Sequence, residues 1–331
     1  MKMFAALGGS ALALLASVGI GLGVASSDAE ARTFLRIAGG IGGSSWEVTA
    51  GKLGNMFSNA SPDIQAIAQP GNMGENLARL KRGEADLGIT YGFVFRDVAS
   101  GTGDFGAHHN PDLRLLAALY PAYQQPLVKN DAPWTSLRDL AKNPGDINIV
   151  MLTPGSATYV ITEAMLRAVG IELDDIRANG GLTLPLNYSQ GLDALRTGRA
   201  NIVSINGPQG HPSVLEFENQ GRLLTFDQEA IDKMVELLPG SAPATIDADS
   251  YAFLSEPYDT VAVFTSLVVN ASVPEKVVYT ITKAFWDNVD EFRATASYAR
   301  ATDISNAMVG SEDLPVHPGA LRYYREKGLV N

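Results

Sequence analysis

A strand that ends in a glycine- and serine-rich turn and leads directly into a helix is predicted twice in this chain. The first unit is residues 34–45, FLRIAGGIGGSS, and the second is residues 147–158, INIVMLTPGSAT. The residues that follow each turn, up to 59 and 170, have apolar side chains at helical spacing. In open α/β sheets, ligands bind at the carboxyl ends of parallel strands, where helix N-termini point. The two turns are therefore expected to present free N–H groups to one small anion across a cleft.

The same alternation of strands and helices continues along the chain. It predicts an α/β fold of parallel βαβ units with right-handed crossovers. Besides the two units above, strands are predicted at 63–69, 85–90, 112–120, 201–205, 222–226 and 260–270, and helices at 74–84, 188–200 and 274–293, while 120–133 is read as a crossing between two sections.

The N-terminus has the composition of a secretory signal. Lys2 precedes an uncharged apolar run over residues 4–25, and the small-residue sequence AEA follows at 29–31. We expect cleavage after Ala31, export to the periplasm, and no direct membrane insertion of the remaining chain. The alternative is an uncleaved anchor, because 22 apolar residues are long enough to span a bilayer.

Charge and cysteine content exclude several classes of function. The chain has a net charge of −11, and −10 without the N-terminal segment, which argues against binding nucleic acid or anionic lipid. The absence of cysteine excludes disulfides, thiolate metal sites and a cysteine nucleophile. No cofactor is expected.

Catalytic and nucleotide-binding motifs are absent from the sequence. The run Gly-Ile-Gly-Gly-Ser-Ser from Gly40 lacks the third glycine of a dinucleotide fingerprint, and no Walker A, H-E-x-x-H or G-x-S-x-G motif occurs. His108 and His109 lie in a polar loop rather than in a metal-binding pattern, and His317 lies between prolines. A binding protein is favoured, and an exported hydrolase-like α/β enzyme is the alternative.

Four segments resemble one receptor family: GNMGENLARLKRGEADLGI (71–89), TPGSAT (153–158), PATIDADSY (243–251) and LPVHPGALRYYREKG (314–328). They are similar to the TAXI-type solute receptors of tripartite ATP-independent periplasmic (TRAP) transporters. The resemblance implies a monomeric receptor for a small organic anion. It also implies a small and a large membrane subunit as partners. A receptor for an ABC importer or a sensor kinase remains an alternative.

The resemblance also implies a two-lobed periplasmic binding fold, type II-like, with the ligand cleft between the lobes. Residues 32–120 and 264–331 would form lobe 1, and residues 121–263 would form lobe 2. Hinges are expected near 120–125 and 259–263, where the two βαβ sections join.

Glycine turns and hydroxyl groups provide the candidate ligand contacts. Where the family has paired tyrosines after its first turn, this chain has Ser45 and Trp46, and bulk is also added at Met73, Tyr91 and Phe93. These changes favour a monocarboxylate, or an anion with an apolar tail, over a compact dicarboxylate. Arg96 and Arg114 are expected to form ion pairs rather than to bind the ligand. The predicted ligand-binding residues are Gly43, Ser44, Ser45, Trp46, Asn72, Met73, Tyr91, Gly155, Ser156, Thr158, Asn206 and Gly207.

Overall fold

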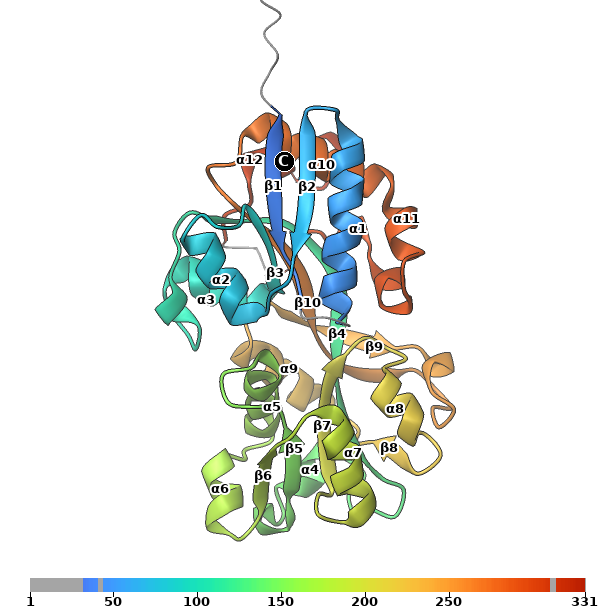
Figure 1. Cartoon of the computed structure of the whole chain (residues 1–331). Helices are drawn as coiled ribbons and strands as arrows, with labels where there is room; N and C mark the ends of the chain where they lie inside the picture. The colour runs from blue at the N-terminus through green and yellow to red at the C-terminus, as the bar shows by residue number, and fades with distance from the viewer. Residues whose placement is uncertain (1–31, 41–43, 310–313, 331) are drawn as a thin grey trace, which may run out of the picture. The chain divides into compact units, whose positions relative to one another are not determined.

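Ten strands within the described residues form one mixed sheet, in the order β2-β1-β3-β10-β4-β7-β5-β6, with β8 beside β4 and β9 beside β10. The computed structural model describes residues 32–40, 44–309 and 314–330. The predicted signal segment, residues 1–31, and Gly43 lie outside the described residues. Figure 1 shows that helices accompany the strands at both ends of the sheet.

Three parallel strands begin the first lobe. In β1 and β2 the register runs from Thr33 opposite Ile64 to Ala38 opposite Gln69, and β3 pairs with the other side of β1. The three strands and the helices α1 and α2 agree with the predicted alternation, whereas no helix was predicted at the position of α3. The elements are β1 (Thr33–Ala38), α1 (Ser45–Ala60), β2 (Ile64–Gln69), α2 (Met73–Lys81), β3 (Leu87–Tyr91) and α3 (Gly92–Ser100).

The second lobe is built around the parallel strands β6, β5 and β7. Its elements are α4 (Leu137–Leu140), β5 (Asn148–Met151), α5 (Ala157–Ala168), α6 (Leu173–Ala178), β6 (Leu182–Pro185), α7 (Tyr188–Thr197), β7 (Ile202–Gly207), α8 (Pro212–Phe217), β8 (Gly221–Leu223), α9 (Gln228–Leu237) and β9 (Ser241–Ile246).

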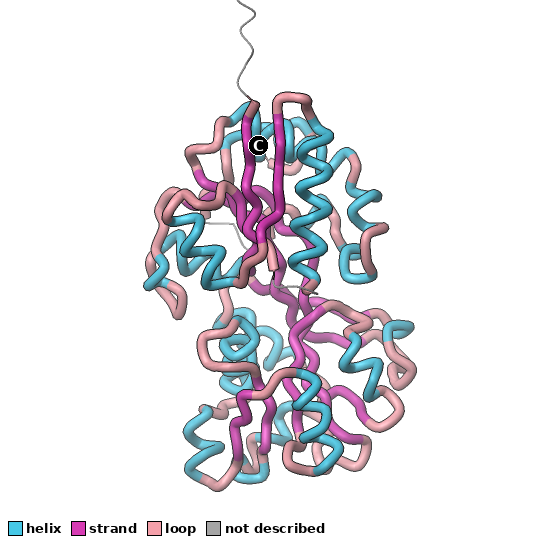
Figure 2. The backbone as a smooth tube through the Cα atoms, viewed as in Figure 1, coloured by secondary structure: helices cyan, strands magenta, loops and turns pink. Residues whose placement is uncertain are grey.

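Two long antiparallel strands, β4 (Leu113–Lys129) and β10 (Tyr258–Asn270), run through both lobes. Beyond Tyr123, β4 changes its partner from β10 to β7, and β10 pairs with β3 at Thr265–Val269 but with β9 at Tyr258–Val263. The strand β4 therefore continues through residues 121–129, which the sequence pattern had assigned to a crossing. Figure 2 shows the continuous strands between the two groups of helices.

The C-terminal helices return to the first lobe. The helix predicted over 274–293 is divided at Asn288, whose side-chain amide donates to the Ala284 carbonyl at 2.8 Å. A core cluster there includes Leu53, Phe57 and Phe285, all with 0% exposure. Burying each such side chain contributes about 1.5–3 kcal/mol. The helices are α10 (Glu275–Asp287), α11 (Val289–Arg293) and α12 (Pro318–Glu326). Within the described ranges, each helix is too short or too polar to cross a bilayer.

Candidate ligand-binding site

A cavity of about 850 Å³ lies where helices from both lobes begin. We call it the uncharged cavity, because no Asp, Glu, Lys or Arg is among the described residues that line it. The structure brings eleven of the twelve predicted ligand-binding residues into this lining, and the twelfth, Gly43, lies outside the described residues. The eleven are Ser44, Ser45, Trp46, Asn72, Met73, Tyr91, Gly155, Ser156, Thr158, Asn206 and Gly207.

Three helices present their N-termini to the uncharged cavity. The side-chain oxygens of Ser44, Asn72 and Ser156 accept the backbone N–H groups of Glu47, Glu75 and Tyr159 at 3.2, 3.1 and 3.2 Å. These caps explain why α1, α2 and α5 begin there. Because each serine oxygen accepts the cap bond, its own O–H hydrogen is left to donate to a ligand.

The first N–H groups of these helices are also available. Those of Ser45, Trp46, Ala157 and Thr158 donate no hydrogen bond to another described residue. Such groups carry the positive end of the helix dipole, and each end stabilises a nearby anion by about 0.3–1 kcal/mol, or up to about 2 where partly buried. The lining can therefore hold a negative group without an ionised side chain.

An aromatic wall closes the first-lobe side of the cavity. The rings of Trp46 and Tyr91 lie 5.1 Å apart and are tilted, and Tyr91 stacks on Phe93 at 6.1 Å. Burial raises the pKa of Tyr91, so its hydroxyl stays protonated at neutral pH. Phe93, which was expected near the ligand, lies behind Tyr91 and lines a different cavity.

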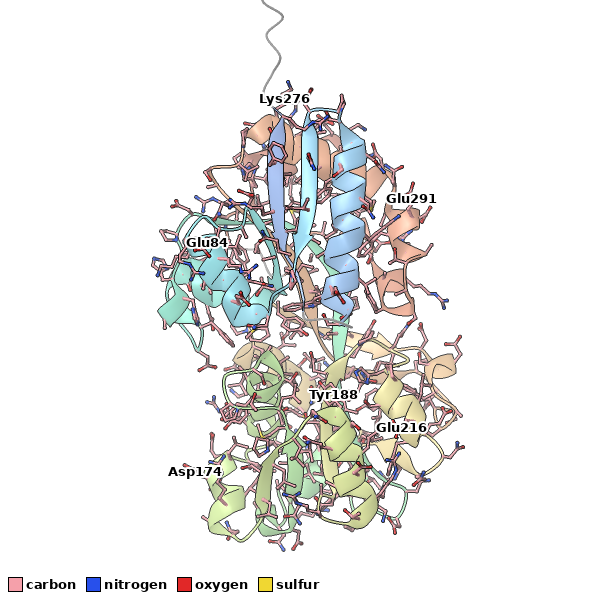
Figure 3. The ribbon with its side chains drawn as sticks, viewed as in Figure 1. Glu84, Asp174, Tyr188, Glu216, Lys276 and Glu291 are labelled. Carbon is pink, nitrogen blue, oxygen red and sulfur yellow. The ribbon has the colours of Figure 1, made fainter. Side chains whose placement is uncertain are left out.

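Tyr188 organises the second-lobe side of the cavity. It begins α7 (Figure 3), and its hydroxyl donates to the Asn206 carbonyl at 3.2 Å and accepts the Asn206 N–H at 3.3 Å. The same hydroxyl lies 3.5 Å from Oγ1 of Thr158. This arrangement fixes the end of β7 against the first turn of α5.

His211 is the main lining residue that sequence reasoning missed. It caps α8, with Nδ1 accepting the Ser213 N–H at 3.2 Å, and its ring meets that of Tyr188 edge-on at 5.2 Å. Burial lowers the pKa of His211 to about 4, so the ring is neutral at neutral pH. The dipeptide His-Pro was a possible signal, because a polar side chain before a proline often marks a helix start.

Arg96 and Arg114 were predicted to form ion pairs rather than to bind the ligand. Arg114 donates to the carbonyls of Pro111 and Leu113 at 2.6 and 2.9 Å, and it forms no ion pair with another described residue. Arg96 lines a separate cavity. Neither arginine lines the uncharged cavity.

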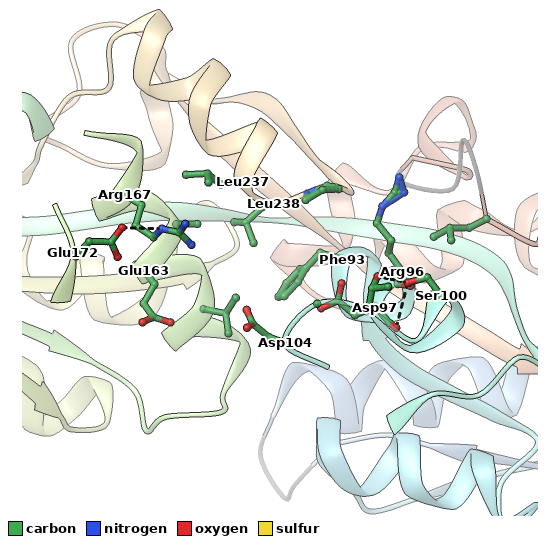
Figure 4. A pocket seen from close by; sticks show the side chains of 16 residues that line it. Phe93, Arg96, Asp97, Ser100, Asp104, Glu163, Arg167, Glu172, Leu237 and Leu238 are labelled. Atoms are coloured by element: carbon green, nitrogen blue, oxygen red, sulfur yellow. Dashed lines mark hydrogen bonds and ion pairs between the residues drawn. The ribbon is translucent and has the colours of Figure 1, made fainter. Parts of the chain in front are cut away.

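The second cavity, of about 660 Å³, is lined by charged groups. We call it the charged cavity. Figure 4 shows Glu163, Arg167 and Glu172 on one side and Asp97 and Asp104 on the other. Arg167 pairs with Glu172 at 3.3 Å. Burial, with the Asp104 charge as a smaller cause, raises the pKa values of Asp97 and Glu163.

No group of three or more His, Asp or Glu side chains in the described part of the chain is placed to hold a metal ion. Among the described residues that line the uncharged cavity there is one imidazole and no carboxylate.

Solved structures share this fold at low sequence identity. A TctC solute-binding protein from Polaromonas has a TM-score of 0.55 at 12% identity, with 89% of this chain and 96% of that chain covered. MatC from Rhodopseudomonas palustris, solved with bound malate, has a TM-score of 0.51 at 13% identity, with 89% of this chain and 96% of that chain covered. A Xanthomonas citri protein, solved with ATP bound, has a TM-score of 0.53 at 11% identity, with 89% of this chain and 96% of that chain covered.

The family comparison covers most of the chain. Residues 37–328 match the model of the NMT1-like family. This range includes the helix starts that line the cavity and both strands shared by the lobes. The chain therefore belongs to the NMT1-like family and has the two-lobed α/β fold of periplasmic solute-binding proteins, with its cleft between the lobes.

Proposed function

We propose that this protein is a periplasmic receptor that captures a small organic anion and delivers it to a TRAP-type membrane complex. One observation carries the binding function. Three helix N-termini meet in a cavity whose lining has no ionised side chain. Such a cavity attracts negative charge through backbone dipoles and offers no carboxylate to pair with a cation.

The ligand in this proposal is a monocarboxylate or an anion with an apolar tail. The carboxylate accepts hydrogen bonds from the first N–H groups of α1 and α5 and from the Ser156 hydroxyl, while the tail lies against Trp46, Tyr91 and Met73. A second carboxylate in the same cavity would lack a cationic partner, and an unpaired buried charge costs several kcal/mol. A compact dicarboxylate is therefore disfavoured.

The receptor role fits the cavity better than hydrolysis does. Nδ1 of His211 is occupied by the Ser213 N–H, and no described serine or threonine hydroxyl is hydrogen-bonded to its ring. A hydrolase of the serine type needs a base within hydrogen-bond reach of its nucleophile. We infer that the ligand leaves chemically unchanged.

Lobe closure over the ligand is part of the proposal. The strands β4 and β10 change partners near residues 123 and 263–265. Bending there would move residues 121–263 against the remainder and enclose the anion on a microsecond-to-millisecond scale. X-ray scattering should show a smaller radius of gyration at saturating ligand; superimposable profiles would contradict closure.

The test of binding is a thermal-shift screen of carboxylates, followed by calorimetry. Ligand at about 100 times its dissociation constant should stabilise the protein by about 2.7 kcal/mol. NMR spectra of the recovered ligand should be unchanged, and turnover that disappears on mutating a lining serine or histidine would instead establish an enzyme. The TRAP assignment predicts genes for a small and a large TRAP membrane subunit beside this one; ABC importer genes there would contradict it.

A further inference from the structure

Two histidines of this chain cap helices in the same way. His211 precedes Pro212 at the start of α8, and His317 precedes Pro318 at the start of α12. In each case Nδ1 accepts the N–H of the residue two positions later, at 3.2 Å. Since Nδ1 is the acceptor in the neutral ring, the proton lies on Nε2.

The two rings differ in what Nε2 binds. Nε2 of His317 donates to the Val273 carbonyl at 3.1 Å, in a residue that is only 2% exposed. Nε2 of His211 donates to no described residue, and its ring lines the uncharged cavity. His317 therefore shows the fully satisfied structural form of this cap, while His211 has one donor remaining.

The ring of His211 is held in place in the cavity that contains the proposed carboxylate site. Tyr188 packs against it edge-on, and a Cβ atom on Gly207 would lie 2.4 Å from its Cδ2, so glycine leaves room for the ring. The Tyr188 hydroxyl reaches Oγ1 of Thr158, in the first turn of α5. The His211 donor and the start of α5 thus line the same cavity and are linked through Tyr188.

The backbone carbonyls around His211 already accept hydrogen bonds from other protein groups. The carbonyl of Asn206 accepts from Tyr188, and those of Gly207 and Pro208 accept from Nε2 of Gln125 at 3.1 and 3.3 Å. The side-chain oxygen of Asn206 is unavailable to a ligand, because less than 1 Å² of it is accessible. This side of the cavity therefore offers a ligand an unused donor, whereas an ammonium group would have to share carbonyl oxygens that already accept from protein donors.

We propose that His211 is a specificity-determining residue whose Nε2–H donates to a second, uncharged oxygen of the bound anion. The cavity then takes oxo and hydroxy acids and rejects amino acids of the same shape. This inference rests on the proposed function, since it assumes that a carboxylate binds at the helix N-termini. It goes beyond the proposed function by stating which kind of polar group the ligand carries next to that carboxylate.

The test uses acids that differ in one group. Phenylpyruvate, 3-phenyllactate, phenylalanine and 3-phenylpropanoate share one tail, and 4-methyl-2-oxopentanoate, 2-hydroxy-4-methylpentanoate, leucine and 4-methylpentanoate share another. Calorimetry should rank oxo and hydroxy acids about tenfold or more above the amino acid of the same tail, since an unpaired buried donor group is costly. They should exceed the unsubstituted acid by about five- to tenfold.

Three variants assign the effect to Nε2. His211→Asn keeps an acceptor for the Ser213 N–H but cannot reach the place of Nε2, so it should reduce oxo-acid affinity to that of the unsubstituted acid. His211→Gln, whose amide nitrogen extends further, should retain part of the preference. His317→Asn is the matched control, because it alters the same cap outside the cavity and should leave all affinity ratios unchanged.

Each contrary result has a distinct meaning. Equal binding of amino and oxo acids would overturn the inference while leaving an anion receptor in place. A wild-type preference for oxo acids that persists in His211→Asn would remove His211 from the explanation and overturn it as well. If neither the substituted nor the unsubstituted acids bind, the proposed function fails and this inference fails with it.

Discussion

The two cavities of this protein differ in where their charge resides. The charged cavity is lined by two arginines and four carboxylate residues, with a formal lining charge of −2, and its arginine at 167 is already paired. The described residues that line the uncharged cavity include no ionised side chain, and three helix N-termini lie there. Under the proposed function, the anion would bind where backbone donors are unused and not where the lining side chains are charged.

The strongest test of this difference between the cavities is to place a carboxylate in the uncharged cavity without removing a helix cap. Aspartate caps helices as well as serine does and favours a helix N-terminus. Ser156→Asp should therefore preserve or raise the melting temperature. It should also weaken binding of organic anions by about 100-fold or more, through repulsion in a poorly solvated site.

The companion variant is Ser156→Ala, which removes the cap and should cost about 1 kcal/mol of stability and roughly tenfold in affinity. The two variants should change stability in opposite directions while both weaken binding. If Ser156→Asp binds anions within about threefold of wild type, the anion does not lie at the start of α5.

The aromatic wall provides the second test. Trp46→Ala should weaken an anion with an apolar tail by roughly 1–3 kcal/mol, because apolar surface buried against the indole is lost. Calorimetry with a short and a long carboxylate measures whether the loss depends on the tail. Trp46→Phe should recover part of the affinity. Unchanged affinity and ligand ranking in Trp46→Ala would show that the indole serves only the packing with Tyr91.

The change of folding stability with pH should have opposite signs for a titrating residue of each cavity. The pKa of His211 falls to about 4 in the folded protein, so the unfolded chain binds more protons between pH 6.5 and 4. Stability contributed by neutral His211 is present above pH 6.5 and should be lost towards pH 4, by roughly 3 kcal/mol. His317 has a pKa lowered in the same direction. Melting temperatures of His211→Asn should fall less steeply than wild type over this range.

A substitution in the charged cavity should change folding stability least, and the contribution of its titrating group to stability should fall as pH rises. Because the pKa of Glu163 is raised, its carboxylate destabilises the fold above that pKa and protonation relieves the cost. Glu163→Gln should therefore raise stability at pH 7 by less than about 1 kcal/mol, since the group is partly solvated. Its affinity for organic anions should equal that of wild type. A large change in ligand affinity would mean that the two cavities are coupled.

Local chemistry explains which parts of the site the sequence could predict. Ser44 and Ser156 were identifiable because capping depends on neighbouring residues, and the glycine turns beside them have the same local origin. The contact between Thr158 and Tyr188, and that between Tyr188 and His211, join residues far apart in the chain. No periodicity predicts such pairs. His211 was missed for this reason, although its cap is local.

The fold shows the same limit in β4. Pro121 and Pro126 lack an N–H group and suggest the end of a strand. The strand nevertheless continues to Lys129, because β10 and then β7 and β8 provide pairing partners. Those partners are specified by distant sequence. The α3 helix, Gly92–Ser100, was also absent from the predicted pattern, since its buried residues form a nearly continuous apolar run.

The position of β10 has a consequence for synthesis. The strand lies between β3 and β4, yet roughly 130 residues separate β4 from it in the chain, so that closing this contact carries a large entropic cost. Until residue 270 has left the ribosome, the facing edges of β3 and β4 have no partner. High contact order of this kind slows folding. Pairing of β3 and β4 with β10 should therefore be among the last steps of folding, and under the proposed export to the periplasm this delay would favour threading across a membrane before the fold is complete.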